Sequence, residues 1–456
     1  MTINQKMYYI LFAILLFTFS KSKAQITIGN TSLDTSTLAN HLNTPWDLIY
    51  TPDSSLFFTE RIGKVSRIDL INNQTHLLID ISPKVEAIGE SGLLGMAINL
   101  NMAVPRIYLV YTYKDSNNTF FEKVESYIYD SNQDTLLFDN KLIDSIPANT
   151  YHTGARLVLH NNQLYISTGD AGNTSLSQDL NSLAGKILRI NLNGSIPNDN
   201  PINGSPIYSW GHRNPQGLYF ANNFMYSSEH GPTTDDEINI ITKGENYGWP
   251  NVHGFCDLAN EITFCNDSNV TEPIYAWTPT VATAGISYYE HSAIPEWNES
   301  ILLATLKDSR LISLKLNSAK DSIVTHSEYL INTFGRLRDV ETNSWGEVFI
   351  ATNSTPHRII KLHNANFTSI NEINSHKYEV KYWPNPANEK LKIKSSNSKI
   401  NNIQLYNIDG KEVLNKTTAT KNLELNTSVF NSGLYILKIT FDDKIQIINK
   451  VVIDHY

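Results

Sequence analysis

Basic side chains at the ends of apolar strands are the groups in this sequence best suited to binding an anionic ligand. Lys307 follows one such strand in ATLKDSR, and Arg336 and Arg338 precede another in GRLRDV. Residues two apart in a strand share a face, so both arginines are expected to point the same way, with Asp339 orienting one guanidinium. Guanidinium groups bind carboxylates through paired hydrogen bonds, so this set predicts a receptor for a small molecule with several carboxylates. Solvated charges at a rim are the alternative.

Glycine-rich motifs hold candidates for acid–base chemistry. His152 stands in YHTGAR, and an imidazole is well matched to removing a proton near neutral pH. His212 and His230 are rival candidates, since the chain has 13 histidines and most must be structural. Arg213, in GHRNPQG, can place a fixed positive charge over a carbonyl oxygen that becomes anionic.

The segment EHGPTTDDE, which starts at Glu229, predicts a site for a hard cation. Its Gly231–Pro232 turn can aim backbone carbonyl oxygens outward together, and calcium accepts such ligands. The acidic run at 235–237 either orients this turn or forms a solvated rim.

These groups lie between repeated pairs of strands, which are the elements that must position them. A short apolar strand, followed by a strand that ends in a basic and an aliphatic residue, recurs six times. The repeats begin near Leu56, Arg106, Gln163, Phe224, Ile301 and Glu347. One small antiparallel sheet per repeat predicts an all-β fold with very little helix, built as a six-bladed β-propeller of four-stranded antiparallel blades over residues 25–368. Radial blades bring loops that are distant in sequence to one central mouth.

Composition and the N-terminus limit the class of protein. The 456 residues carry a formal net charge of −9, which argues against a nucleic-acid partner because phosphate binding needs clustered lysine and arginine. Lys6, an apolar run from Tyr8 and small residues around Ala24 indicate a signal peptide at 1–24. This run is too short for a permanent span, which needs ~20 residues, and no later stretch approaches that length. The sequence therefore predicts a secreted protein with no stable membrane span.

The only two cysteines, Cys256 and Cys265, flank a short polar segment. In an oxidising compartment they are expected to form a disulfide that stiffens a loop at the mouth, and loop closure contributes ~2–3 kcal/mol. A zinc site is disfavoured because no cysteine or histidine pair with ligand spacing lies nearby.

Composition changes at about residue 379. Residues 379–456 hold 11 lysines and 8 acidic residues, a charge of +3. Because the whole chain carries −9, residues 1–378 carry −12. Five or six short strands in this tail predict a small Ig-like β-sandwich. The motifs YWPNPA from Tyr382, IDGK from Ile408 and SGLY from Ser432 resemble the C-terminal sorting domain of type IX secretion substrates. That resemblance implies export by the type IX machinery to the cell surface or the medium; a carbohydrate-binding or spacer module is the alternative.

The motifs of the repeat region also resemble a family. They are GESGLLGMAIN, YHTGARL, YISTGDAG, GHRNPQGL, SSEHGPTTDDEINII, GENYGWPN, TLKDSR and GRLRDV, in this order. Together they resemble the glucose/sorbosone dehydrogenases, which implies a six-bladed propeller that uses pyrroloquinoline quinone (PQQ) and calcium. The variant EHGP at 229–232 is closer to the aldose sugar dehydrogenase branch than to the soluble glucose dehydrogenases, where glutamine commonly replaces the histidine.

The resemblance also implies roles for the residues. His152 is the general base on the anomeric hydroxyl while hydride moves to PQQ, and Arg213 stabilises the developing oxyanion. The carbonyls of Gly231 and Pro232 bind calcium, which acts as a Lewis acid. The residues expected to contact PQQ are Arg213, Asn214, His230, Thr280, Lys307, Arg336 and Arg338.

Three residues are expected on the substrate side. Glu90 stands where the family often has glutamine, and Tyr151 where some glucose oxidisers have aspartate, so both put glucose itself in doubt. Trp277 resembles a segment that lines the pocket, although a core or rim aromatic is an equal alternative.

The leading hypothesis is a secreted PQQ- and calcium-dependent dehydrogenase that oxidises the anomeric C1 hydroxyl of aldoses to lactones and reduces an unknown acceptor. The alternative is a non-enzymatic propeller of the same lineage that binds a glycan or protein partner. Survival of the base, the arginines and the lysine favours the enzyme. A calcium-dependent lactone hydrolase would need carboxylate and asparagine ligands around the axis, and the basic groups disfavour it.

Overall fold

The computed structural model describes residues 26–100, 102, 104–367, 380–395, 398–407, 411–441 and 446–455. The chain divides into two compact units, 1–367 and 368–456. The segment interpreted as a signal peptide lies outside the described residues. Within them, no helix is both long enough and apolar enough to cross a membrane.

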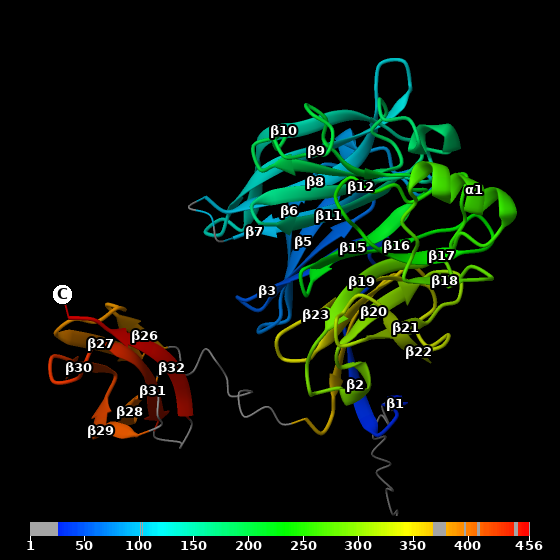
Figure 1. Ribbon diagram of the computed structural model, residues 1–456. Helices are drawn as coiled ribbons and strands as arrows, with labels where there is room; N and C mark the ends of the chain where they lie inside the picture. Colours follow the sequence, from blue (N-terminus) through cyan, green and yellow to red (C-terminus); the bar gives the residue numbers. More distant parts are fainter. Residues whose placement is uncertain are drawn as a thin grey trace, which may run out of the picture. The chain divides into compact units, whose positions relative to one another are not determined.

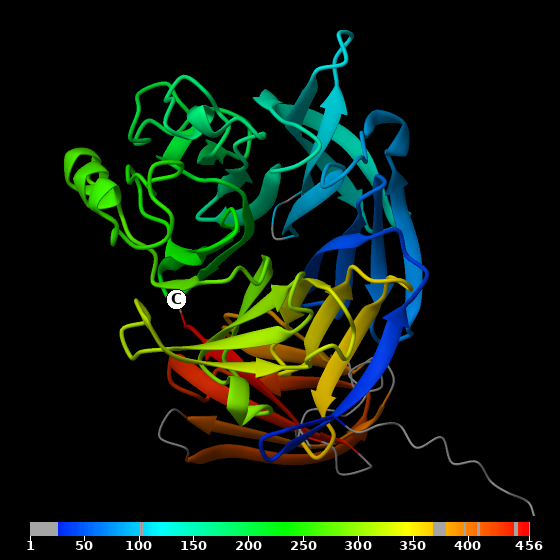
Figure 2. The same cartoon turned by 90° about the vertical axis from the view of Figure 1, so that its right-hand side faces the viewer.

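The first unit is a ring of six antiparallel sheets, which follow one another around a central axis (Figures 1 and 2). The innermost strands are β3 (Pro45–Thr51), β7 (Leu93–Asn99), β11 (Gly154–His160), β15 (Pro215–Ala221), β19 (Thr283–Tyr289) and β23 (Leu337–Thr342). The second strands are β4 (Ser55–Glu60), β8 (Arg106–Lys114), β12 (Gln163–Thr168), β16 (Phe224–Glu229), β20 (Ser300–Thr305) and β24 (Val348–Thr352). The third strands are β5 (Lys64–Asp69), β9 (Phe120–Asp130), β13 (Lys186–Asn191), β17 (Asp236–Ile240), β21 (Leu311–Leu316) and β25 (Ile359–Asn364).

The outer strands show how the ring closes. In five blades they are β6 (Gln74–Asp80), β10 (Thr135–Pro147), β14 (Ile207–Trp210), β18 (Tyr275–Trp277) and β22 (Ile323–Tyr329). In the sixth blade, β25 pairs instead with β2 (Thr31–Ala39), which pairs with β1 (Ile26–Ile28). The N-terminal strands therefore complete the last blade. The predicted six-bladed propeller is confirmed, with a fifth strand in its last blade.

Burial follows from the position of each strand in its blade. The second strands are packed between neighbouring blades, and every residue of β4 and β20 is buried. The outer strand β22 faces solvent and is mostly exposed. Apolar side chains from adjacent blades form shared cores, such as Tyr108 of β8 with Leu164 of β12. The strands therefore form a rigid frame for the loops at their ends.

Buried charges join the innermost strands on the axis. Arg156 of β11 pairs with Asp47 of β3 and with Asp339 of β23. The backbone N–H of Leu48 donates to Asp339 at 2.7 Å, and that of Met96 donates to Asp47 at 2.6 Å. Contacts between neighbouring innermost strands thus depend on side chains, since no backbone ladder joins one blade to the next. Asp339 was expected to orient Arg336 or Arg338, and this expectation was wrong.

The space around the axis is crowded at the level of these buried charges and is open further along the innermost strands. A Cβ atom on Gly285 of β19 would lie 1.6 Å from Oδ1 of Asp339, so only glycine fits there. The guanidinium of Arg156 lies 4.3 Å from the ring centre of Trp46. Further along the strands lies an axial cavity of about 230 Å³, lined by apolar residues and Glu341, with Asp47, Arg156 and Asp339 at one end. The charged layer separates this cavity from the loops at the N-terminal ends of the innermost strands.

We predict that the stability of the propeller falls as the pH rises from about 5 to 7.5. Burial, together with the nearby carboxylate of Asp339, raises the pKa of Asp47 from 3.8 to about 7 against the opposing effect of Arg156. Between these values the folded state binds more protons than the unfolded state, so the free energy of unfolding decreases with pH, by up to about 2 kcal/mol. Urea denaturation at pH 5.0 and 7.5 measures this decrease in the free energy of unfolding. Asp47→Asn should flatten the profile; an unchanged slope would contradict this assignment.

A single α-helix, α1 (Ala259–Ser268), interrupts the loop between β17 and β18. Three short 3₁₀ turns, η1 (Ser82–Lys84), η2 (Thr174–Ser177) and η3 (Pro295–Trp297), are the other helical elements of the described chain. The predicted disulfide joins Cys256 and Cys265, whose Cα atoms are 6.4 Å apart. The segment expected to be a polar loop is helical because Glu261 accepts the backbone N–H of Leu258, at 3.2 Å, and so caps the first turn.

The second unit is a sandwich of two antiparallel sheets. One sheet has the order β26 (Val380–Trp383), β27 (Lys390–Ser395), β30 (Asn422–Asn426). The other has the order β29 (Glu412–Thr420), β28 (Ile400–Asn407), β31 (Gly433–Phe441), β32 (Gln446–Ile453). Alternate residues of β27 and β31 point into a common core. The predicted β-sandwich is confirmed, with seven strands where five or six were expected.

Candidate active site

The predicted site residues lie in loops at one end of the propeller. Loops that lead from an outer strand to the next innermost strand carry Glu90, Tyr151, His152, Arg213, Asn214, Thr280 and Arg336. Loops between second and third strands carry Gly231, Pro232 and Lys307. In each blade, the innermost strand starts on the side where the second strand finishes. Both kinds of loop therefore meet at one mouth.

His152 is held by a buried carboxylate. Its Nδ1 lies 2.8 Å from Oδ1 of Asp170, which also accepts the backbone N–H of Gly172 at 2.7 Å. Oδ2 of Asp170 accepts the indole N–H of Trp249 at 3.0 Å. A buried carboxylate that accepts from Nδ1–H leaves the lone pair of His152 on Nε2. The pair therefore presents an oriented base, which resembles the His–Asp part of a catalytic triad.

The other two histidine candidates are internal. His212 is completely buried between Glu229, 3.0 Å from its Nδ1, and Ser209, 2.9 Å from its Nε2. His230 places Nε2 2.5 Å from the carbonyl oxygen of Thr283, and burial lowers its pKa. Both nitrogens of His212 and Nε2 of His230 are therefore committed to neighbours. His152 is the histidine of the three that is placed to act as a base.

Glu90 lies directly beside the base. Its Oε2 accepts the backbone N–H of His152 at 3.0 Å and the side-chain amide of Asn214 at 3.3 Å. Asn214 in turn accepts the backbone N–H of Gly154 at 3.0 Å. Tyr151 is exposed and packs edge-on to the His152 ring, with 4.9 Å between ring centres. Glu90 and Tyr151 thus lie within reach of a ligand at Nε2.

Arg213 is fixed from both its backbone and its side chain. Its guanidinium lies 5.3 Å from the Trp249 ring centre, and Nη1 donates to the carbonyl oxygen of His230 at 3.2 Å. The backbone N–H groups of Arg213 and Asn214 both donate to Oε1 of Glu229. Glu229 therefore holds two consecutive site residues in place.

Several guanidinium groups near the mouth keep unpaired donors, although the carboxylate of Glu90 interacts with each of them. Among the described residues, the buried Nε atoms of Arg61, Arg213 and Arg338 have no hydrogen-bond partner. Burial, together with the neighbouring cations, lowers the pKa of Arg338 to about 10 against the opposing effect of the Glu90 carboxylate. Crowded cations with unpaired donors favour an anionic ligand. A small molecule with several carboxylates, such as PQQ, fits this donor set.

The two arginines of GRLRDV interact electrostatically but differ in exposure, which strand alternation did not predict. Arg336 is exposed and precedes β23, whereas Arg338 is 7% exposed and donates to Oε1 of Gln216. A register shift between Leu337 and Asp339 breaks the alternation. Lys307 is exposed and donates to Oγ1 of Thr280 at 3.1 Å.

The turn with Gly231 and Pro232 is held from behind by Asp236. This buried carboxylate accepts the backbone N–H groups of Gly231 at 2.8 Å and of Val281 at 2.7 Å. A Cβ atom on Gly231 would lie 1.9 Å from the carbonyl oxygen of Thr234, so the turn requires glycine. Within the described chain, no cluster of three or more His, Cys, Asp or Glu side chains is placed to hold a metal ion. A hard cation here would depend on backbone oxygens, which suits calcium.

Some important residues escaped the sequence analysis, and one prediction is not supported. Asp170 and Trp249 were present in the motifs YISTGDAG and GENYGWPN but were not singled out, because nothing local indicates that they bind each other. Arg61 lies in the first strand repeat but was likewise not singled out. Trp277 is 9% exposed and packs in a core with Tyr226 and Ile238, so its position favours a structural role over substrate contact.

Comparison with known proteins gives the family. The family model described as Glucose / Sorbosone dehydrogenase matches residues 42–361. This chain belongs to the glucose/sorbosone dehydrogenase family. It is therefore an oxidoreductase of the sugar dehydrogenase type. The model for a secretion system C-terminal sorting domain matches residues 381–454, so the tail is such a domain, and it implies export to the cell surface or the extracellular space.

Relatives of this dehydrogenase include enzymes of known activity. It is 29% identical to quinoprotein glucose dehydrogenase B of Acinetobacter calcoaceticus, over 75% of this chain and 88% of the relative. It is 28% identical to the aldose sugar dehydrogenase YliI of Escherichia coli (strain K12), over 73% of this chain and 93% of the relative.

Solved structures agree with the family. The PQQ-bound aldose sugar dehydrogenase of Streptomyces coelicolor superposes with a TM-score of 0.63 at 29% identity, over 73% of this chain and 98% of that chain. The apo form of the soluble aldose sugar dehydrogenase of Escherichia coli superposes with a TM-score of 0.65 at 27% identity, over 73% and 99%.

Proposed function

We propose that this sugar dehydrogenase oxidises the anomeric hydroxyl of aldoses to lactones with PQQ and calcium. The observation that carries the proposal is the oriented His152–Asp170 pair at a mouth where buried guanidinium donors lack partners. A base and a receptor for a polycarboxylate are the two parts that such a reaction needs. Two of the relatives, a quinoprotein glucose dehydrogenase and an aldose sugar dehydrogenase solved with PQQ bound, support the same cofactor.

The residues of the mouth would hold the cofactor by charge and by backbone oxygens. Lys307, Arg336 and Arg338 would neutralise its carboxylates, with Thr280 and Asn214 as polar contacts, and His230 would pack beside them. The carbonyl oxygens of Gly231 and Pro232 would bind calcium. When bound, PQQ with calcium supplies the hydride acceptor.

The chemistry of the protein itself centres on one proton and one developing charge. Nε2 of His152 accepts the proton of the anomeric hydroxyl, and Asp170 stabilises the imidazolium that forms. Arg213 offers a fixed positive charge to the oxygen that becomes anionic, and stacking on Trp249 keeps its guanidinium in place. Glu90 and Tyr151, next to the base, would select among aldoses.

Reconstitution tests the proposal. The full chain, purified without cofactor, is mixed with PQQ and CaCl₂, and reduction of dichlorophenolindophenol is followed with a panel of aldoses. We expect lactone formation from at least one aldose, loss of activity with EDTA, and recovery when calcium is returned. PQQ binding without turnover of any aldose would instead favour a propeller that binds a glycan or protein partner.

We also propose the processing of the chain: a signal peptide at 1–24, a propeller domain at 25–368 and a type IX sorting domain at 379–456. The motifs that start at Tyr382 and Ser432 and the family match support the last assignment. Mass spectrometry of the exported protein locates the N-terminus and the C-terminus of the mature chain. The mature N-terminus should follow Ala24. Deletion of 379–456 should leave the propeller inside the outer membrane.

A further inference from the structure

The loop that carries α1 presents an apolar surface to solvent. Phe255, Leu258 and Ile262 are 43, 57 and 45% exposed. Leu258 and Ile262 are separated by one helical turn and so share a face. We call these three residues, together with the exposed Asp257 and Asp267, the α1 platform.

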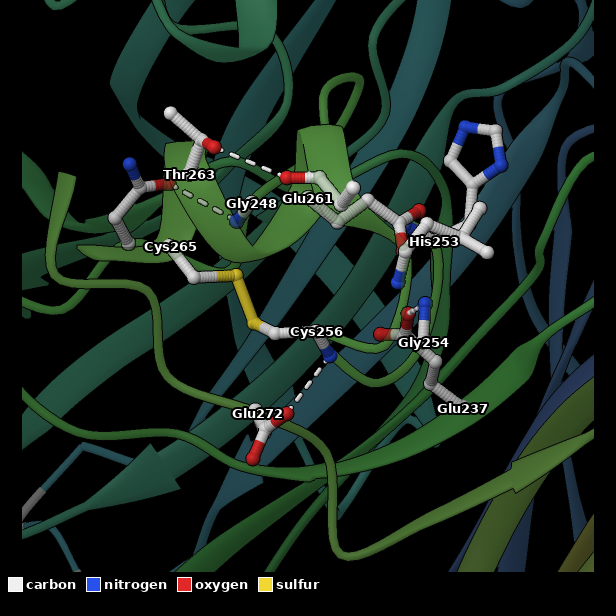
Figure 3. Close-up of a disulfide and its surroundings, with 12 residues drawn as sticks. Glu237, Gly248, His253, Gly254, Cys256, Glu261, Thr263, Cys265 and Glu272 are labelled. Carbon is white, nitrogen blue, oxygen red and sulfur yellow. Dashed lines mark hydrogen bonds between the residues drawn. A yellow bond between two sulfur atoms is a disulfide. The ribbon is translucent and has the colours of Figure 1, made fainter. Parts of the chain in front are cut away.

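The platform is held rigidly. The disulfide Cys256–Cys265 joins the loop to the helix, and Glu272 accepts the backbone N–H of Cys256 at 2.7 Å (Figure 3). Glu261 accepts the backbone N–H of His253 at 3.1 Å. A rigid exposed apolar surface lowers the entropic cost of binding another molecule and is typical of an interface.

The exposed charged side chains of residues 244–274, the segment that carries α1, are all acidic. Residues 244–306 contain no lysine or arginine. Asp257, Asp267 and Glu272 are the exposed acidic residues in and next to the platform. The propeller part of the chain as a whole is also strongly acidic. An apolar patch flanked by acidic groups complements a partner with an apolar patch flanked by lysines, and such charges raise the association rate.

The platform is continuous with the mouth. The backbone N–H of Gly254, next to Phe255, donates to Oε1 of Glu237 at 2.8 Å, on the strand that follows the Gly231–Pro232 turn. His253 and Arg213 line one narrow crevice together with this turn. A molecule seated on the platform would therefore lie beside the site proposed to hold the cofactor.

We infer that the α1 platform is the docking surface for a cationic one-electron redox protein, the electron acceptor of the enzyme. This inference rests on the proposed function. Oxidation of one aldose to its lactone releases two electrons and two protons. Two acceptor molecules dock in turn and take one electron each, and the protons pass to solvent.

Charge reversal at the platform tests the inference with lysine-rich cytochrome c as the probe. Asp257→Lys/Asp267→Lys should lower kcat/KM for cytochrome c at least 10-fold at low salt and leave dye reduction unchanged. Calorimetry should show binding of oxidised cytochrome c to the wild-type chain and at least 10-fold weaker binding to the variant, with or without PQQ. Asp53→Lys/Asp321→Lys, the same charge change in turns at the opposite end of the blades, is the matched control.

The apolar part is tested separately. Leu258→Ser/Ile262→Ser should weaken cytochrome c binding about 5-fold at both low and high salt, because apolar contacts are not screened. Equal effects of the platform and control variants, or no binding by the wild type, would overturn the inference. Self-association of the wild type that the serine variant abolishes would identify a second copy of the chain as the occupant and would also overturn it. Absence of aldose-dependent dye reduction would count against the proposed function, and calorimetry would still decide on the platform.

Discussion

His152→Ala is expected to lower kcat for aldose oxidation about 10²- to 10⁴-fold, the range that a positioned general base contributes. The physical reason is that Nδ1 is committed to Asp170, so Nε2 is the atom that can take the substrate proton. The affinity for PQQ should stay within about twofold, because the guanidinium donors of the mouth are untouched. Steady-state dye reduction gives kcat, and titration of the apo chain with PQQ gives the affinity.

Two variants complete this experiment. His326→Ala removes an exposed histidine of β22 that contacts Tyr275, and it should leave kcat unchanged. Asp170→Asn removes the carboxylate that orients His152 and stabilises its imidazolium, so kcat should fall while the affinity for PQQ stays unchanged. If His152→Ala abolished PQQ binding while the chain stayed folded, the residue would hold the cofactor and our assignment of the base would be wrong.

Arg156→Met is expected to destabilise the propeller by about 3–5 kcal/mol, the usual cost of leaving buried charge without its partner. The substitution removes the guanidinium that Asp47 and Asp339 share on the axis. It also leaves their carboxylates buried beside each other. Urea denaturation at pH 7.5, followed by tryptophan fluorescence, measures the loss.

An exposed ion pair supplies the control for this variant. Lys141→Met breaks the exposed pair with Asp144 on the outer strand β10, and it should leave the free energy of unfolding nearly unchanged. Adding Asp47→Asn and Asp339→Asn to Arg156→Met should recover much of the stability, because no charge is then left buried. If the triple variant is as unstable as the single one, packing against Trp46 is the cause and charge is not.

The sequence analysis was most successful where function depends on residues that are close along the chain. The pair Gly231–Pro232, the dipeptide Arg213–Asn214 and the motif around His152 each lie within one loop, and the structure brings all three to the same mouth. The sequence analysis failed where a contact involves a residue of another blade. Asp339 was assigned to the arginines beside it, yet it pairs with Arg156, 183 positions away.

By itself, the sequence determined the strand repeats, the number of blades, the β-sandwich tail and the motifs of the family. These features depend on alternation, turn residues and local spacing, which are properties of neighbouring positions. Tertiary structure alone decided that Asp170 orients His152, that Arg338 is buried while Arg336 is exposed, and that Trp277 packs in a core. The physical reason is ring closure: the axis and the mouth are assembled from six blades, and which loops meet there depends on how the strands pack between blades.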